Sequence, residues 1–220
     1  MEAIECVKTR ISVRKFKSDP VPKETLVEIV EAAQRSPSYR NCQPWEVVIV
    51  SGKKKEALSS LLVHLAETGV GFKPDIPPPG LWPDTFSERM EEFIKKRAAV
   101  LNIKINDPQF MKNSLIANFR FYGAPHAIFL CQDSSLSTWQ ILEMGMFAQS
   151  LMLAAHAKGL GTVPQAYLTN YSEEVKNFLE IPESKRLVLG LSVGYPDPKD
   201  KASTFRSDRI EVMSILRWVE

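Results

Sequence analysis

Apolar residues along the chain recur at characteristic spacings, and each spacing predicts one kind of element. From residue 23 to 35 they lie three or four positions apart, as at Ile29 and Ala33, which predicts an amphipathic helix. Residues 138–158 are apolar almost all round, which is typical of a helix buried in a core or a subunit interface. Gly159 is a natural end for that helix. Further helices are expected at 2–9, at 53–67, at about 85–101, and from Ser172 onward.

Short apolar runs bounded by turn residues predict four strands. The run at 186–196 is the most apolar, which is typical of a strand in the middle of a sheet. The other strands are expected at 45–51, 126–132 and 162–168, the last as a short strand or an extended segment. Helices and strands alternate along the chain, so we expect both kinds of element to be mixed in one fold.

Residues 69–84 are the least regular part of the chain. They include five prolines and two aromatic residues, Phe72 and Trp82. Proline-rich stretches of this kind serve as linkers or as lids. Because the elements on either side need each other to build one core, we expect a single domain over residues 1–220. The proline-rich segment and the helix after it, at about 69–105, form a surface excursion in this interpretation.

Composition narrows the possible functions. The 28 Lys and Arg residues nearly balance the 26 Asp and Glu residues, for a net charge of +2, so no nucleic-acid partner is expected. The cysteines Cys6, Cys42 and Cys131 lie far apart, which is typical of reduced thiols in a cytosol. The apolar run at 144–157 is too short and too interrupted to span a membrane. With no secretory signal among the charged first residues, we expect a cytoplasmic protein without a membrane partner.

Motifs that would name a chemistry are scarce. The sequence has neither GxGxxG nor GxxxxGK(S/T), the glycine-rich loops that bind dinucleotides and phosphates. His64, His126 and His156 lie far from one another and none belongs to HExxH, so no metal site is expected. If the protein is an enzyme, we expect a cofactor rather than a side chain to supply the hard chemistry.

The stretch RISVRKF places Arg10, Ser12 and Arg14 at alternate positions. In an extended segment these three side chains project to one side. One interpretation is a solvated edge with arginines at the surface. The other is an anion site, because guanidinium groups and a hydroxyl together suit a phosphate. Two further polar clusters, each unremarkable alone, lie at 36–43 and at Arg206 with Arg209.

Four motifs occur in a fixed order: RISVRKF, SPSYRNCQPW, GLGTVPQAYL, and GYPDP followed by FRSDR. In order and spacing they resemble the nitroreductase family of FMN-dependent oxidoreductases, and the resemblance runs essentially from end to end. Each motif alone is moderately specific, whereas four in order are strong. The stretch NFRFYGAPHAIF, with a proline-rich insertion before it, is similar to the branch that includes nitrobenzoate reductases.

The resemblance implies a fold, a cofactor and a partner. The fold is an α+β sandwich with a central mixed sheet flanked by helices. The protein would be an intertwined homodimer with two FMN sites at the interface and NADH or NADPH as the hydride donor. The C-terminal segment would cross to the other subunit, which would cover the apolar stretch SILRWVE.

The resemblance also implies roles for individual residues. Arg10 and Ser12, joined by Arg206, would hold the phosphate and ribityl end of FMN. Arg14 would lie near the N1 edge of the flavin ring. The remaining implied contacts are Pro37, Ser38, Tyr39 and Asn41 from the other subunit, Pro164, Gln165 and Ala166 against the ring, and Asn118 as a further polar contact.

The implied activity is ping-pong reduction of a nitroaromatic, quinone or similar electron-poor acceptor, without a dedicated acid or base. Reductive dehalogenation, enone reduction and ring dehydrogenation on the same fold remain alternatives, as does a flavin-binding protein without turnover. The chain departs from the family at Ala166 and Tyr167, where an acidic residue and a glycine are more common, so Tyr167 would reshape the substrate side. We also expect the proline-rich segment to border the substrate entrance, with Trp82 or Phe72 near the ring.

Overall fold

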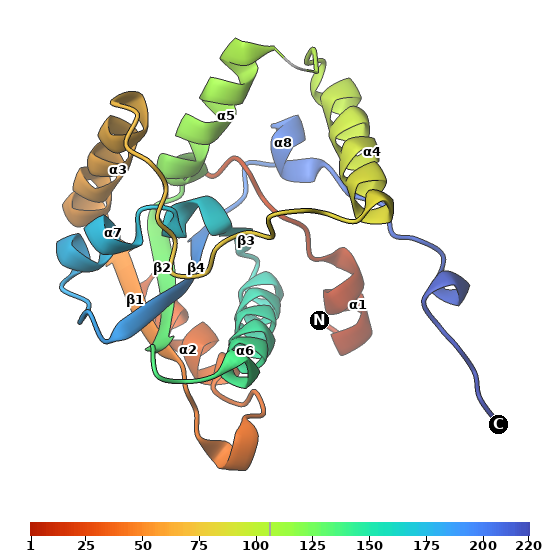
Figure 1. Cartoon of the computed structure of the whole chain (residues 1–220), viewed down its shortest axis with the longest axis horizontal. Coiled ribbons are helices and arrows are strands. Elements are labelled where there is room, and N and C mark those ends of the chain that lie inside the picture. The colour runs from red at the N-terminus through yellow and green to blue at the C-terminus, as the bar shows by residue number, and fades with distance from the viewer. Residues whose placement is uncertain (106) are drawn as a thin grey trace.

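The computed structural model describes residues 1–105 and 107–220, and a four-stranded sheet forms its centre (Figure 1). Across the sheet the strands follow the order β1 (Glu46–Ser51), β2 (His126–Asp133), β4 (Lys185–Gly194) and β3 (Gly161–Gln165). All three neighbouring pairs are antiparallel. The predicted α+β class is confirmed, and the expected central position of β4 is confirmed with it.

One feature of the expected sheet needs correction, because the four strands do not form a mixed sheet. Each strand pairs with neighbours that run in the opposite direction. Among the described residues, parallel pairing is limited to two isolated bridges, Ser12 with Thr162 and Lys73 with Tyr171. Parallel contacts therefore come from extended segments beside the sheet and not from its strands.

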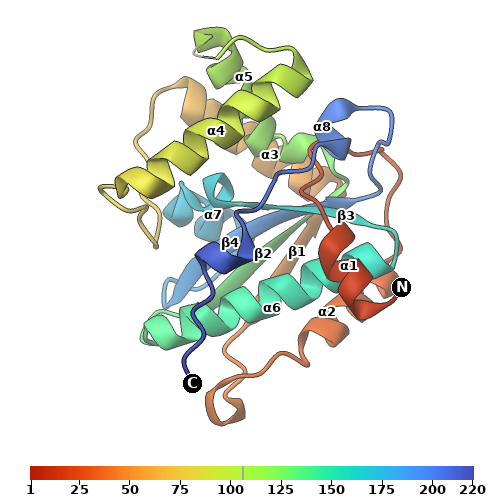
Figure 2. The same cartoon turned by 90° about the vertical axis from the view of Figure 1, so that its right-hand side faces the viewer.

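Helices cover both faces of the sheet (Figure 2). α2 (Lys23–Ala33) and α6 (Thr138–Ala157) pack on one face, and α3 (Gly52–Glu67), α5 (Pro108–Phe119) and α7 (Ser172–Leu179) pack on the other. Strand β2 is buried on both sides, so its alternate residues serve the two cores. Phe129 faces the core with α3 and α5, and Ile128 faces the core with α2 and α6. Each such buried side chain stabilises the fold by about 1.5–3 kcal/mol.

The long helix α6 begins and ends as its sequence predicts. The Ser137 hydroxyl and the Gln140 side chain form a capping box at its first turn. Past its end, Gly159 adopts φ +76°, a left-handed conformation that favours glycine. Trp45 stacks on Phe147 with ring centroids 5.0 Å apart, which joins the helix to the start of β1.

The helix α5 was not among the helices expected from the sequence. Its start is marked by Asp107, whose carboxylate accepts the backbone N–H of Gln109 at 3.0 Å, and by Pro108 in its first turn. Only Asn118 and Phe119 at its end are buried, so the helix lacks the long apolar stripe that would reveal it. The remaining α-helices are α1 (Ala3–Thr9), α4 (Asp84–Leu101) and α8 (Lys201–Thr204).

Two glycines let neighbouring segments lie close to the sheet. A Cβ on Gly161 would lie 2.6 Å from the Val13 side chain, so the segment after α1 can pack on β3 only because this residue is glycine. A Cβ on Gly190 would lie 2.5 Å from Leu168, in the 3₁₀ turn Ala166–Thr169 that follows β3. Both contacts position segments that carry predicted site residues.

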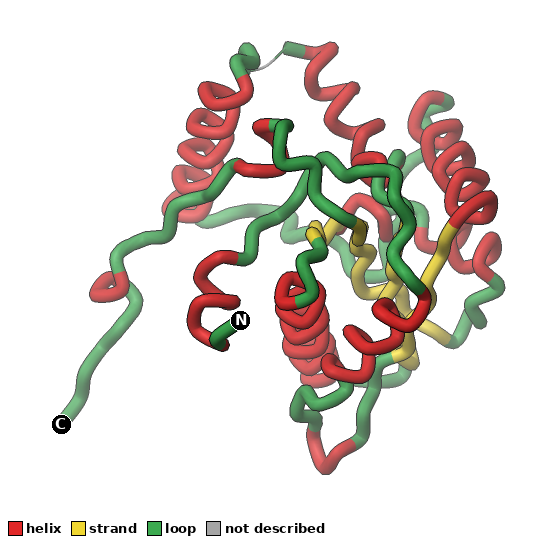
Figure 3. The backbone as a smooth tube through the Cα atoms, turned by 180° about the vertical axis from the view of Figure 1, so that it is seen from behind, coloured by secondary structure: helices red, strands yellow, loops and turns green. Residues whose placement is uncertain are grey.

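The C-terminal segment follows α8 and projects from the body of the chain toward its end (Figure 3). It contains one 3₁₀ turn, Val212–Ser214, and otherwise runs without regular structure. Among the described helices, none combines the length and the apolar character needed to cross a membrane.

Candidate functional site

A hollow of about 570 Å³ lies where the segment after α1 meets α4, α6 and the C-terminal segment. It brings together four predicted site residues, Arg10, Ser12, Arg14 and Arg206. Its other lining residues are Val7, Lys8, Ile11, Phe93, Gln149, Phe205, Ser207 and Arg209. In the described part of the chain, no Asp or Glu is among the lining residues. We refer to the cavity as the arginine hollow.

Edge strand β3 directs the extended segment that follows α1. The backbone N–H of Val13 donates to the carbonyl of Thr162 at 3.0 Å, and Ser12 forms its parallel bridge with the same residue. Because Val13 is buried against the sheet, the residues that alternate with it turn away from the core. This alternation places Arg10, Ser12 and Arg14 along the hollow.

The C-terminal segment supplies two more guanidinium groups. Arg206 donates to the carbonyl oxygens of Lys8 and Thr9 at 3.2 and 3.3 Å. Those carbonyls belong to the last turn of α1, where helix carbonyls lack partners within the helix. Arg209 folds back on Ser207, donating to its hydroxyl at 2.8 Å. The segment is therefore fastened at the rim of the arginine hollow.

The positive charges of the arginine hollow lack carboxylate partners. In the part of the chain that the structure describes, Arg10, Arg14, Arg206 and Arg209 form no salt bridge. Nη1 of Arg10 is buried without a hydrogen-bond partner, and burial, followed by the charge of Arg209, lowers the pKa of Arg10. A buried donor without an acceptor is costly. A phosphate fits this arrangement, because it would supply both acceptor oxygens and negative charge.

His156 on α6 experiences the same excess of positive charge. Its pKa is lowered by burial first and then by Arg10 and Arg206. Nε2 of the ring lies 2.8 Å from the Thr9 hydroxyl, at the end of α1. The hollow therefore disfavours a further cation, as expected of a site that is completed by an anion.

A second group of predicted residues lies at the end of β3. Nε2 of Gln165 donates to the backbone carbonyl and to Oδ1 of Asn118, at 3.1 and 3.2 Å. Both side chains are buried. Pro164 before them is half-buried and Ala166 after them is exposed, so this segment leads from the core to the surface.

Tyr122 connects the two groups. Burial raises the pKa of its hydroxyl, and the nearby Arg14, Arg97 and Asn118 lower that pKa by smaller amounts. Arg97, on α4, was not among the predicted residues, because an arginine on a charged helix is usually solvated. Its pKa is lowered by burial and then by Arg14, so the surface excursion brings a further cation to this side of the site.

The predicted loop residues lie apart from the arginine hollow within one chain. These residues are Pro37, Ser38, Tyr39 and Asn41, and none of them lines that hollow. Tyr39 instead lines a separate surface hollow with Ser137, Trp139 and Gln140. The structure of a single chain therefore brings together only part of the predicted site.

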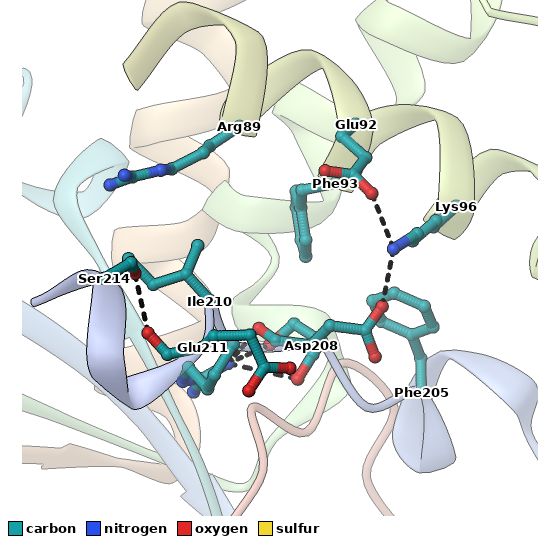
Figure 4. A pocket seen from close by; sticks show the side chains of 11 residues that line it. Arg89, Glu92, Phe93, Lys96, Phe205, Asp208, Ile210, Glu211 and Ser214 are labelled. Atoms are coloured by element: carbon teal, nitrogen blue, oxygen red, sulfur yellow. Dashed lines mark hydrogen bonds and ion pairs between the residues drawn. The ribbon is translucent and has the colours of Figure 1, made fainter. Parts of the chain in front are cut away.

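A larger hollow of about 670 Å³ adjoins the first, between α4 and the C-terminal segment (Figure 4). Nζ of Lys96 lies 2.7 Å from carboxylate oxygens of both Asp208 and Glu92. The rings of Phe93 and Phe205 meet edge to face, with centroids 5.8 Å apart, and both line the two hollows. These contacts hold the C-terminal segment against α4, beside the arginine hollow.

Phe72 of the proline-rich segment lies beside the 164–166 segment. Its ring packs edge-on against Tyr167 and Tyr171, with centroids 6.5 and 5.2 Å away. Tyr167 directly follows Ala166 in the chain, and both Phe72 and Tyr167 are about half exposed. An aromatic surface therefore borders the exposed end of β3.

Other kinds of site find no support. Over residues 1–105 and 107–220, no group of three His, Cys, Asp or Glu residues is placed to hold a metal ion. Residues 190–194 read GLSVG, the spacing of a serine nucleophile on a tight turn. Here Ser192 is fully buried inside β4 and its hydroxyl donates to Gln165, so it does not reach a substrate.

Comparison with known proteins points in one direction. Residues 7–195 match the Nitroreductase family model. The chain is 34% identical to "Nitroreductase NfnB" of Mycolicibacterium smegmatis, over 96% of this chain and 90% of that protein. It is 32% identical to "4-nitrobenzoate reductase" of Pseudomonas putida, over 92% and 89%. The crystal structure of the FMN-dependent nitroreductase NfnB from Mycobacterium smegmatis in complex with NADPH aligns with a TM-score of 0.94 and 32% identity, covering 99% and 98% of the two chains.

Proposed function

Because the chain belongs to the nitroreductase family, we propose that it is an FMN-dependent oxidoreductase that uses NADPH or NADH to reduce nitroaromatic or similar electron-poor acceptors. The observation that carries this proposal is the arginine hollow, where four guanidinium groups meet without a carboxylate and one of them has a buried, unpaired nitrogen. The names of the relatives support nitroaromatic acceptors, and the NADPH complex of one relative supports that donor.

The residues of the arginine hollow would hold the phosphate end of FMN. Arg10 offers the unpaired Nη1, and Ser12 adds a hydroxyl on the same side of the segment. Arg206 is already oriented by the last carbonyls of α1, so little side-chain freedom remains to be lost on binding. Burial, followed by the like charge of Arg209, lowers the pKa of Arg10, and a bound dianion would offset both effects.

The flavin ring would lie toward the end of β3. Arg14 would approach its pyrimidine edge, with Asn118 and Gln165 as neighbouring polar contacts. Pro164 and Ala166 would lie against the ring. The half-buried position of Arg14 and the burial of Asn118 and Gln165 support this assignment, since preorganised groups in a partly dry site act most strongly on charge.

When bound, FMN supplies hydride acceptance and hydride delivery. The chain contributes charge, orientation and access. Arg14, together with Arg97 behind it, would stabilise negative charge on the pyrimidine edge. The exposed aromatic surface of Phe72 and Tyr167 would offer a stacking face for a flat acceptor, a contact typically worth about 0.5–1.5 kcal/mol.

The active form in this proposal is a homodimer. Seven described residues of the C-terminal segment are large, apolar and exposed: Ile210, Val212, Met213, Ile215, Leu216, Trp218 and Val219. An exposed apolar stretch of this kind is typical of a segment that docks on another surface. Its exchange between subunits would cover it, and the partner's loop would then bring Pro37, Ser38, Tyr39 and Asn41 to the flavin.

The experiment that tests this function is the visible absorbance spectrum of the purified protein under anaerobic conditions. We expect flavin bands that bleach within seconds on addition of NADPH or NADH and return on addition of 4-nitrobenzoate. Bands that persist with both donors would indicate a flavin-binding protein without turnover. A protein that stays colourless after incubation with FMN would contradict the cofactor and the site. Bleaching followed by reoxidation with a halogenated phenol or an enone, and not with nitroaromatics, would favour the other flavin chemistries.

A further inference from the structure

A buried chain of hydrogen bonds joins the middle of the sheet to the Asn118–Gln165 pair. The hydroxyl of Ser192, on β4, donates to Oε1 of Gln165. Nε2 of Gln165 donates to Asn118, and Nδ2 of Asn118 donates to the carbonyl of Ser114 at 2.9 Å. Ser192, Gln165 and Asn118 are 0%, 2% and 7% exposed. The chain therefore runs through the interior, with little access to bulk water.

Two backbone carbonyls fix the direction of every bond in this chain. The carbonyl oxygens of Asn118 and Ser114 can only accept, so the groups that face them must be the NH₂ groups of Gln165 and Asn118 respectively. Oε1 of Gln165 consequently faces Ser192, and the hydroxyl there must donate. Ser192 is therefore the one donor to Gln165 Oε1 that the described residues provide.

The sheet register holds Ser192 at the required place. Ser192 pairs with Val163 across the β3–β4 ladder, and Gly190, two residues earlier on the same face, pairs with Gln165. Because Gly190 lacks a side chain, the space beside Gln165 is taken up by Leu168 and the hydroxyl of Ser192 remains its polar neighbour. A residue in the middle of the sheet is thus hydrogen-bonded directly to the Gln165 amide.

We propose that Ser192 is a positioning residue for the flavin site, acting through Gln165 on the polar contacts of the flavin ring. This inference rests on the proposed function, in which Gln165 and Asn118 lie at that ring. Without the hydroxyl, Oε1 of Gln165 is left buried and unsatisfied, and the amide turns to find another donor. The turn withdraws Nε2 of Gln165 from the backbone carbonyl and Oδ1 of Asn118, so the Gln165 amide loses its fixed orientation and Asn118 loses that donor, while Nδ2 of Asn118 stays on the Ser114 carbonyl.

The experiment compares Ser192→Ala, Ser192→Thr and Ser192→Val in the full-length protein. Thr keeps the hydroxyl, whereas Val has nearly the same shape without it, so the Thr–Val pair isolates the hydrogen bond at constant volume. The readouts are the dissociation constant for FMN, the visible spectrum of bound FMN and its midpoint potential, all measured where circular dichroism shows a folded protein. For Ala and Val we expect FMN binding weaker by about threefold to tenfold, the factor for one lost hydrogen bond, with altered spectrum and potential.

Ser172→Ala is the matched control. Ser172 is also buried, its hydroxyl donates to the carbonyl of Thr169 at 2.8 Å, and it accepts the N–H of Asp75 at 3.1 Å. It lies outside the Ser192–Gln165–Asn118 chain, so its loss should lower stability and leave the spectrum and the potential of bound FMN unchanged.

The outcomes separate this inference from the proposed function. We expect Ser192→Thr to keep the wild-type spectrum and midpoint potential of bound FMN. We expect Ser192→Ala and Ser192→Val to change both. Ala and Val variants that lose stability but bind FMN with wild-type affinity, spectrum and potential would overturn the positioning role alone. A wild-type protein that binds no FMN would overturn the proposed function, and the inference with it.

Discussion

The backbone N–H of Tyr39 donates to Oε1 of Glu143 at 2.7 Å, across 104 residues of sequence. Glu143 belongs to the apolar helix α6 and is 5% exposed. Its second oxygen accepts the thiol of Cys42 at 3.4 Å. Between these two anchors, Arg40 and Asn41 have φ of 49° and 59°, in the left-handed region that residues with a Cβ seldom adopt. A buried carboxylate thus holds a strained loop in one shape.

Glu143→Ala should destabilise the protein, because it removes the acceptor for both anchors. A hydrogen bond to a charged group contributes about 1.5–3 kcal/mol. We therefore expect the free energy of unfolding, measured in urea, to fall by about 2 kcal/mol. Glu31→Ala, at an exposed position on α2, is the control and should change it by less than about 0.5 kcal/mol. Equal effects of the two substitutions would show that the loop is held by other contacts.

The same carboxylate should control the reactivity of Cys42. Desolvation by the surrounding loop, followed by the hydrogen bond and the charge of Glu143, raises the pKa of this exposed thiol. Because the thiolate is the nucleophile, Glu143→Gln should lower that pKa and speed alkylation of Cys42 by iodoacetamide at pH 8. Mass spectrometry would follow a single modified site, since Cys6 and Cys131 are buried and burial raises the pKa of Cys131 to about 12. An unchanged rate would contradict the contact.

The loop illustrates what the sequence reveals and what it does not. The Ser, Pro and Asn residues over 36–44 are typical of a loop, and the structure has a loop there with one 3₁₀ turn, Tyr39–Asn41. Nothing local in the sequence pairs Tyr39 with Glu143, because the contact exists only after the sheet has brought α6 beside the loop. The alternation of Arg10, Ser12 and Arg14 is a local pattern that the sequence shows directly. Their proximity to Arg206 depends instead on the path of the C-terminal segment in the folded chain.

The elements that were predicted well are those whose burial leaves a periodic trace. β4 and α6 are apolar over most of their length and were placed within a few residues. α5 buries only its last residues, so its pattern resembles that of a loop. The sequence predicted the helix α4 but did not indicate that it borders the site. Arg97 and Phe93 are single residues on a charged helix, and only the tertiary structure shows that they face the site.

Arg10→Ala should weaken FMN binding and leave the protein without FMN no less stable. The substitution removes a guanidinium whose Nη1 is buried and unpaired and whose pKa is lowered by burial and by Arg209. We expect a loss in FMN binding of about 1.5–3 kcal/mol, the range for hydrogen bonds to charged groups. Titration of the FMN-free protein, followed by flavin fluorescence, would measure it. Arg35→Ala, at an exposed position after α2, should bind FMN normally. Wild-type affinity in Arg10→Ala would remove Arg10 from the phosphate site.

His126 should make the fold sensitive to acid. The N–H of Val21 donates to its Nε2 at 2.9 Å, so Nδ1 carries the proton and donates to the Ser51 hydroxyl at 2.6 Å. Burial, followed by the charge of Lys55, lowers its pKa below the ordinary 6.5. As pH falls below about 6.5 the unfolded chain takes up a proton that the folded one resists, so the free energy of unfolding decreases with falling pH.

Urea unfolding at pH 7.5 and pH 5.5 would measure that decrease. His126→Gln can accept and donate the same bonds without titrating, so its stability should fall less between the two pH values than that of the wild type. His64→Gln, at an exposed position on α3, should follow the wild type. Parallel losses in wild type and His126→Gln would assign the pH dependence to other groups, of which His156 is one, since its pKa is lowered too.

The proline-rich segment has an anchored half and an exposed half. The N–H of Lys73 donates to the carbonyl of Asn170 at 2.7 Å, and a carboxylate oxygen of Asp75 accepts the N–H of Leu187 at 2.7 Å. Beyond these contacts the chain is exposed, with Leu81 at 87% and Trp82 at 45%. The anchored half packs Phe72 beside Tyr167, so the exposed half starts close to the aromatic surface at the end of β3.

Replacing residues 77–82 by a Gly-Ser linker of equal length should therefore change the choice of acceptor and spare the cofactor. We expect unchanged FMN affinity, and kcat/KM for nitroaromatics altered by about twofold to tenfold relative to a quinone, the factor for one aromatic contact. Asp75→Ala is the contrasting variant. Because it releases the anchored half, it should lower the free energy of unfolding more than it changes the choice of acceptor. If the linker variant loses FMN as well, the segment is scaffold. If its acceptor preferences match the wild type, residues 77–82 do not border the entrance.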